Sequence, residues 1–158
     1  MKSEPDVYSI DHLAGQKKKT DHWDGIRNYQ ARNFIRDDMS VGDLALFYHS
    51  NCDEPGIVGI IEIVRSAYPD HTAFDPEEKY FDPKSDPDHP RWFMVDVRLK
   101  KKFRHGVLLK DIRAQTKLQK MRLVQRGNRL SILPVAKAEW NHILRMMCED
   151  YLIGHTNA

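Results

Sequence analysis

The chain has 158 residues, of which 41% are hydrophobic and 30% are charged, with a formal net charge of +2, and this predicts one globular domain over residues 1–158. No run approaches the roughly 20 apolar residues of a membrane span, and Met1–Asp6 lacks the apolar core of a signal peptide, so we expect neither membrane insertion nor secretion. Cys52 and Cys148 form no CxxC pair, which excludes a disulfide framework and a multi-cysteine zinc site and favours a reducing cytoplasm.

The first half of the chain contains signals for two short helices and two buried strands. Ser9 is a suitable N-cap, which predicts a helix over Ser9–Ala14, and a second short helix is expected over Gln30–Asp37. A turn-like Gly-Asp pair precedes the apolar run Leu44–Ser50, and a Pro-Gly pair opens the β-branched run Ile57–Val64. Both runs are typical of buried strands.

The second half contains one more strand and two more helices. Five prolines among acidic residues make Tyr68–Pro90 a long ordered excursion without a central strand. Trp92–Phe103 alternates apolar and polar residues, as a half-exposed strand does. A helix over Leu108–Ala114 is expected to open near Gly106, and an apolar stripe predicts a helix over Ala138–Met147. Strands that cluster between short helices favour an α+β, mainly β fold with a small mixed or barrel-like sheet.

Charge is segregated along the chain. Arg98–Arg129 holds twelve Lys and Arg residues and one acid, for a net +11, whereas Pro69–Asp96 holds eight acids and three bases, for a net −5. If the basic side chains share one face, they supply the sequence-independent attraction for phosphate on which nucleic-acid binding depends. The alternative is a solvated, lysine-rich surface.

The usual catalytic motifs are absent from the sequence. It contains no dinucleotide-binding or Walker glycine pattern, no GxSxG elbow and no HExxH, and its eight histidines do not pair at ligand spacing. We therefore expect no metal and no cofactor. Asp24, His49 and Asp96 are the candidate acid–base groups for a base-processing or nucleotide-processing enzyme, and no nucleophile is paired with them.

The loop before the second predicted helix has the composition of a binding loop. Two aromatic rings can stack on a planar ligand, an amide can contact a base edge and two arginines can hold phosphates, at Trp23, Tyr29, Asn28, Arg27 and Arg32. The alternative is a structural loop in which Trp23 belongs to the core and Arg27 forms a surface ion pair.

Six ordered blocks of sequence carry a resemblance to a known family. In chain order they are KSEPDVYSIDHL, WDGIRNYQARNFIR, LFYHSN, GIVGIIEIV, YFDPKSDPDHPRWFMVDV and RGNRLSILPV followed by EW. Together they span Lys2 to about Met147 and resemble the EVE domain family. The resemblance implies a PUA-like fold, a small, strongly curved β-barrel wrapped by short helices, related to the SRA and YTH modules that flip out a modified base and hold it in an aromatic pocket.

The resemblance also implies a function. EVE domains are regarded as non-enzymatic readers of modified nucleobases, mainly modified cytosine in DNA, so we expect modified DNA as the partner. An RNA-modification binding module and a base-processing enzyme are the alternatives. A reader of this kind would be cytoplasmic, or associated with the nucleoid in a bacterium. The sequence has no heptad repeat, which favours a monomer.

The same resemblance assigns site residues. The pocket is expected to be lined by the WDG-RNYQARN loop, the end of the YHS strand and a short apolar RLS strand, that is, by Trp23, Asp24, Asn28, Tyr48, His49, Ser50, Ser131 and Leu133, with Ser3 and Glu4 beside it. In this scheme Trp23 and Tyr48 stack on the base, and Asn28, Ser50 or Ser131 reads its polar edge. The expected phosphate contacts are the loop arginines Arg27, Arg32, Arg126 and Arg129.

Overall fold

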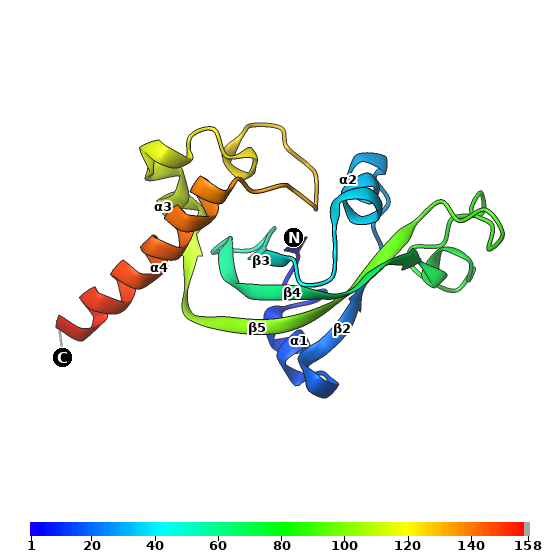
Figure 1. Ribbon diagram of the computed structural model, residues 1–158, viewed down its shortest axis with the longest axis horizontal. Helices are drawn as coiled ribbons and strands as arrows, with labels where there is room; N and C mark the ends of the chain where they lie inside the picture. Colours follow the sequence, from blue (N-terminus) through cyan, green and yellow to red (C-terminus); the bar gives the residue numbers. More distant parts are fainter. Residues whose placement is uncertain (157–158) are drawn as a thin grey trace.

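The computed structural model describes residues 1–156, with side chains described for residues 1–147 (Figure 1). Within this part of the chain, five strands form one sheet in the order β1-β3-β4-β5-β2. Only β1 and β3 run parallel, and the other neighbours are antiparallel. The strands are β1 (Lys2–Ser3), β2 (Thr20–Trp23), β3 (Leu44–His49), β4 (Gly56–Pro69) and β5 (Phe93–Leu108).

The sheet is strongly bent but does not close. The pairing of β4 with β5 shifts register at four places, between Ile57 and Gly59, Ile60 and Ile61, Ile63 and Arg65, and Arg65 and Tyr68. Such bulges bend and twist a sheet. The edge strands β1 and β2 have two and four residues and do not pair with each other. The predicted α+β, mainly β class is therefore confirmed, and the small curved β-barrel that the resemblance implies is here an open, curved sheet.

The strands predicted over Leu44–Ser50, Ile57–Val64 and Trp92–Phe103 are present as β3, β4 and β5, and β4 and β5 are longer than expected. β5 continues through Gly106 to Leu108, because Val107 and Leu108 pair with Ile57 and Gly56 of β4. The prediction that the following helix opens near Gly106 was therefore wrong, since α3 spans Leu109–Ala114.

The helices are α1 (Ile10–Gly15), α2 (Tyr29–Asn33), α3 and α4 (Lys137–Thr156), with short helical turns at Lys17–Lys19, Phe34–Asp38, His71–Ala73, Thr116–Leu118 and Arg122–Val124. In Figure 1, α3 and α4 lie at one end of the sheet, α1 lies below β5 beside β2, and α2 lies on the opposite side, above β4. Ser9 caps α1, accepting a hydrogen bond from the backbone N–H of His12 at 3.2 Å. The last helix, α4, begins without a Ser or Asp cap. The Glu139 carboxylate instead accepts a hydrogen bond from the backbone N–H of Ala136 at 2.9 Å. Among residues 1–156, no helix combines the length and apolarity needed to cross a membrane.

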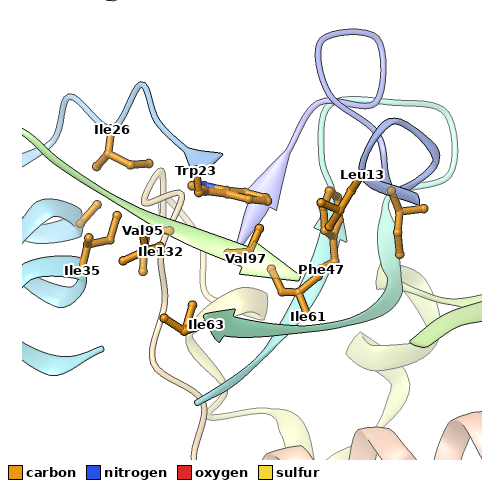
Figure 2. Close-up of a cluster of buried hydrophobic side chains, with 12 residues drawn as sticks. Leu13, Trp23, Ile26, Ile35, Phe47, Ile61, Ile63, Val95, Val97 and Ile132 are labelled. Atoms are coloured by element: carbon orange, nitrogen blue, oxygen red, sulfur yellow. The ribbon is translucent and has the colours of Figure 1, made fainter. Parts of the chain in front are cut away.

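Two hydrophobic clusters occupy the described part of the molecule. The first packs α1 and α2 on the sheet and includes Trp23 and Phe47, whose rings meet edge to face with centroids 5.2 Å apart (Figure 2). The second packs α3 and α4 on the sheet and includes Tyr48. Trp23 is only 7% exposed and Tyr48 only 6%. The interpretation of Trp23 as a core residue is therefore correct for most of its surface.

Candidate functional site

A cavity of about 500 Å³ lies where β1, β2 and five connecting segments meet. Its wall combines carboxylates, cations, hydroxyls and aromatic rings from segments far apart in the sequence. The lining residues are Lys2, Ser3, Glu4, Val7, Tyr8, Asp21, His22, Trp23, Asp24, Gly25, Ile26, Ser50, Lys79, Tyr80, Arg129 and Ser131. The volume lies within the range of roughly 300–1,000 Å³ that is typical of small-ligand pockets.

Backbone hydrogen bonds to β1 hold two of these segments together. The N–H of Lys2 donates to the carbonyl of Ser131 at 2.8 Å, and the N–H of Ser50 donates to the carbonyl of Ser3 at 2.9 Å. The predicted RLS strand was wrong, because Ser131 lies in an irregular segment that makes one such bond rather than a strand ladder. The two serines that the sequence placed beside a pocket, Ser50 and Ser131, nevertheless line the same cavity.

Asp70 fixes the loop between β2 and α2. Its carboxylate is fully buried and accepts hydrogen bonds from the N–H of Gly25 at 2.9 Å, from Arg27 Nη1 at 2.8 Å and from the N–H and hydroxyl of Thr72 at 2.9 and 2.6 Å. Burial alone would raise the pKa of Asp70, but these donors and the Arg27 charge hold it below its ordinary value. The loop that carries Trp23 and Asp24 is therefore locked to the segment that follows β4.

The same loop holds Tyr80 against the cavity. Arg27 Nε donates to the carbonyl of Tyr80 at 2.8 Å, so the arginine joins Tyr80 to Asp70. The Tyr80 ring lies directly on Gly25, where an added Cβ would be only 2.6–2.9 Å from three ring carbons. Gly25 also has a φ of +73°, a conformation that favours glycine. A glycine at this position therefore allows an aromatic ring to form part of the wall.

The carboxylates of the cavity differ in their partners. Asp21 accepts a hydrogen bond from the Tyr8 hydroxyl at 2.6 Å and lies 3.2 Å from His22 Nδ1. Burial and this hydrogen bond raise the pKa of Tyr8. Asp24 lies 3.9 Å from His22 Nε2, and burial raises the pKa of Asp24 above its ordinary value. Of the two aspartates, Asp24 therefore has more freedom to accept hydrogen bonds from a ligand.

The structure brings together only part of the predicted pocket. The predicted pocket residues that line the cavity are Ser3, Glu4, Trp23, Asp24, Ser50 and Ser131. Four others have structural roles or lie outside it. The Asn28 side chain caps α2 by accepting a hydrogen bond from the N–H of Ala31 at 3.0 Å, and His49 Nε2 accepts one from the N–H of Ile10 at 3.1 Å. Tyr48 belongs to the second core cluster, and Leu133 is half-buried outside the cavity.

The four arginines that were predicted to contact phosphate also differ in their positions and partners. The Arg27 guanidinium donates to the Asp70 carboxylate and to the carbonyl of Tyr80, which leaves little of it for a phosphate. Arg32 donates from Nε and Nη2 to the Asn33 side chain and from Nη1 to the carbonyl of Arg91, which leaves little for a ligand. Arg126 is exposed outside the cavity, and Arg129 lines it. Of these four arginines, Arg129 is the one that lies at the cavity, as a phosphate contact would require.

Several cations of the basic segment are paired with carboxylates. On β5, Arg98 and Lys100 pair with Glu62 at 2.9 and 3.2 Å, and Lys102 pairs with Asp11. Of the twelve basic residues in Arg98–Arg129, the cavity is lined by Arg129 alone. The solvated-surface interpretation therefore applies to the β5 part of the segment.

Sequence reasoning missed several lining residues, among them Tyr8, Asp21, Lys79 and Tyr80. Tyr8 and Tyr80 lie in sequence blocks that carry the family resemblance, so the signal was present although no role was assigned. Tyr29, which was expected to stack on a ligand, stacks instead on Trp92, with centroids 5.0 Å apart. It lies outside the cavity.

The candidate acid–base groups are separated in the structure. His49 bonds to α1, Asp96 accepts from the Tyr68 hydroxyl, and only Asp24 lines the cavity. Within the residues that the structure describes, no group of three or more His, Cys, Asp and Glu side chains is arranged to hold a metal ion.

Comparison with known proteins assigns the chain to a family. The model of the EVE domain family matches residues 1–146. The chain belongs to the EVE domain family. Two relatives of this EVE domain are thymocyte nuclear protein 1 of Homo sapiens, 42% identical over 92% of this chain and 72% of the human protein, and that of Danio rerio, 40% identical over 95% of this chain and 71% of the fish protein.

Solved structures share the fold of this EVE domain. A hypothetical protein from Leishmania major is 48% identical, with a TM-score of 0.89 over 96% of this chain and 94% of that one. The human THYN1 protein, solved in complex with 5-methylcytosine-containing DNA, is 42% identical, with a TM-score of 0.88 over 93% of this chain and 95% of that one. The resemblance seen in the sequence is thus confirmed.

Proposed function

We propose that this EVE domain is a non-enzymatic reader of modified cytosine in DNA that holds the modified base, flipped out of the duplex, in the cavity. The observation that carries the proposal is the match over 93% of the chain to human THYN1 in complex with 5-methylcytosine-containing DNA. The separation of His49 and Asp96 from Asp24 supports binding without chemistry on the base.

The wall of the cavity supplies aromatic contact for such a base. Tyr80 is half-buried and lies over Gly25, while Trp23 contributes only the small part of its indole that the core leaves exposed. Tyr80 therefore takes the stacking role that the sequence assigned to Trp23 and Tyr48. Flipping a base costs a few kcal/mol, and stacking on an aromatic side chain returns roughly 1–3 kcal/mol per base.

Asp24 is suited to select cytosine over thymine. 5-Methylcytosine and thymine both carry a methyl group, and they differ at the edge where cytosine has an N4 amine and thymine an oxygen. A carboxylate accepts from the amine and repels the oxygen. Asp24 lines the cavity, and among the residues with described side chains no Lys or Arg nitrogen lies within 4.0 Å of its carboxylate.

The Asp24→Asn variant is expected to lose this selection. An amide of the same shape donates as well as accepts, so it tolerates the thymine oxygen. The preference for 5-methyl-deoxycytidine over thymidine, measured by competition for the cavity, should fall by about 5- to 150-fold, the equivalent of roughly 1–3 kcal/mol for a specific base contact. An unchanged preference would remove Asp24 from base recognition.

Base flipping is tested with 2-aminopurine beside the methylated cytosine, because its fluorescence rises when its neighbour leaves the stack. We expect a rise when the protein binds the methylated duplex and a smaller one with the unmodified duplex. Binding without any rise would mean that the base stays stacked and the cavity is not used. Competition by methylated single-stranded RNA tests whether binding is restricted to DNA. Nucleoside analysis of the DNA after incubation tests whether the base is left chemically unaltered, as we expect.

A further inference from the structure

Three cations from separate segments line the one cavity described above. Lys2 belongs to β1, Lys79 lies between the His71–Ala73 turn and β5, and Arg129 lies between the Arg122–Val124 turn and α4. Lys79 and Arg129 are exposed, which places them where the cavity meets solvent, and Lys2 is half-buried. We call these three residues the cationic rim.

The cationic rim is free of internal ion pairs. Among the residues with described side chains, 1–147, no carboxylate lies within 4.0 Å of a charged nitrogen of Lys2, Lys79 or Arg129. The cations of β5 differ, because Arg98 and Lys100 share Glu62. A cation without an internal partner keeps its full attraction for an external anion.

The two aspartates of the cavity are less exposed than Lys79 and Arg129. Asp21 and Asp24 are 21% and 31% exposed in their side chains, and Asp21 is bound by Tyr8 and His22. Glu4 is the exposed acid beside the cationic rim. The cavity thus combines two partly buried aspartates, which can accept hydrogen bonds from a base edge, with two exposed cations, Lys79 and Arg129.

We infer that Lys2, Lys79 and Arg129 bind the backbone phosphates on both sides of the nucleotide whose base enters the cavity. The inference rests on the proposed function, since a base inside the cavity leaves its sugar and phosphates at the opening. The ligand class is the phosphodiester of a polynucleotide, which a lysine contacts as a point charge and an arginine through paired N–H donors. Charge counting along the sequence pointed to phosphate binding by the segment 98–129, which contains Arg129 but neither Lys2 nor Lys79.

The salt dependence of binding to an unmodified duplex tests the cationic rim. Each phosphate contact adds about 0.9 to the slope of log affinity against log salt concentration. The Lys2→Met, Lys79→Ala and Arg129→Ala variants should each lower the slope by about 1. Arg98→Ala removes the same charge from a residue paired with Glu62 and should leave the slope unchanged.

The outcomes separate this inference from the proposed function. Unchanged slopes in the three variants, or an equal fall in Arg98→Ala, would overturn the cationic rim even if the wild type prefers methylated DNA. Reduced slopes in a protein without such a preference would support the cationic rim and contradict the reading of a modified base. A wild-type protein that binds no duplex at low salt would overturn both.

Discussion

Replacing Asp70 with alanine is expected to lower the free energy of unfolding by about 3–5 kcal/mol, the cost of removing one partner of a buried ion pair. The Asp70 side chain is fully buried, and its loss leaves Arg27, which is 20% exposed, without its carboxylate. The N–H groups of Gly25 and Thr72 lose their acceptor as well. Urea unfolding followed by tryptophan fluorescence measures the change.

Asp37→Ala is the matched control for Asp70→Ala. It also removes an aspartate from an arginine, since Arg36 Nε lies 2.7 Å from Asp37 Oδ1, but the two side chains are 40% and 49% exposed. Exposed pairs of this kind contribute little to stability. We expect no measurable change in the control, and equal effects of the two substitutions would contradict the structural role given to Asp70.

Asp70 also makes stability depend on pH. The pKa of Asp70 lies below its ordinary value in the folded protein and is about 3.9 in an unfolded chain. The unfolded state therefore binds the proton first as the pH falls. The stabilisation is present above about pH 5 and is lost as the pH drops through the lowered pKa. The difference in unfolding free energy between wild type and Asp70→Asn should therefore narrow on acidification, whereas parallel curves would show that Asp70 does not titrate in this way.

Replacing Gly25 with alanine is expected to weaken binding of methylated DNA by about 5- to 150-fold. The new Cβ would lie 2.6 Å from a carbon of the Tyr80 ring, so the ring must leave its place in the cavity wall. The expected loss corresponds to one stacking contact, roughly 1–3 kcal/mol. Tyr80→Ala should give a similar loss, because it removes the same ring. Fluorescence anisotropy with a labelled methylated duplex measures both.

Gly42→Ala provides the control for backbone strain. Gly42 has a φ of +94°, and an added Cβ there meets nothing within 4 Å. Both glycine variants therefore carry the cost of a left-handed alanine, about 1–2 kcal/mol, but only one of them displaces Tyr80. If Gly42→Ala and Gly25→Ala weaken binding equally, the Tyr80 wall is not part of the binding site.

The elements predicted correctly are those whose sequence carries a local signal. β3 and β4 are runs of apolar and β-branched residues, and α1 has its Ser9 cap. β2 was missed because Thr20–Trp23 is mostly polar and shows no alternation of its own. Its extended form comes from pairing with β5, where Asp21 lies opposite Val97. Pairing between distant segments also determines the length of β5.

The binding site was predicted less completely because its geometry depends on contacts between distant residues. Arg27 looks like a phosphate ligand in the sequence, and only the fold shows the buried Asp70 43 residues away. The same contact brings Tyr80 to Gly25, so a tyrosine in an acidic, proline-rich segment becomes part of the cavity wall. The family resemblance pointed to the segments of Asp24, Ser50 and Ser131, which line the cavity, and their part in binding stays a prediction.

The most direct test of the central claim compares duplexes that differ only in one cytosine, which is unmodified, methylated or hydroxymethylated. Tryptophan fluorescence titration gives the affinity of the folded wild-type protein for each duplex. We predict tighter binding of a modified duplex than of the unmodified one, and loss of this preference in Gly25→Ala but not in Gly42→Ala. Equal affinity of the wild-type protein for all three duplexes would contradict the claim that the cavity reads modified cytosine.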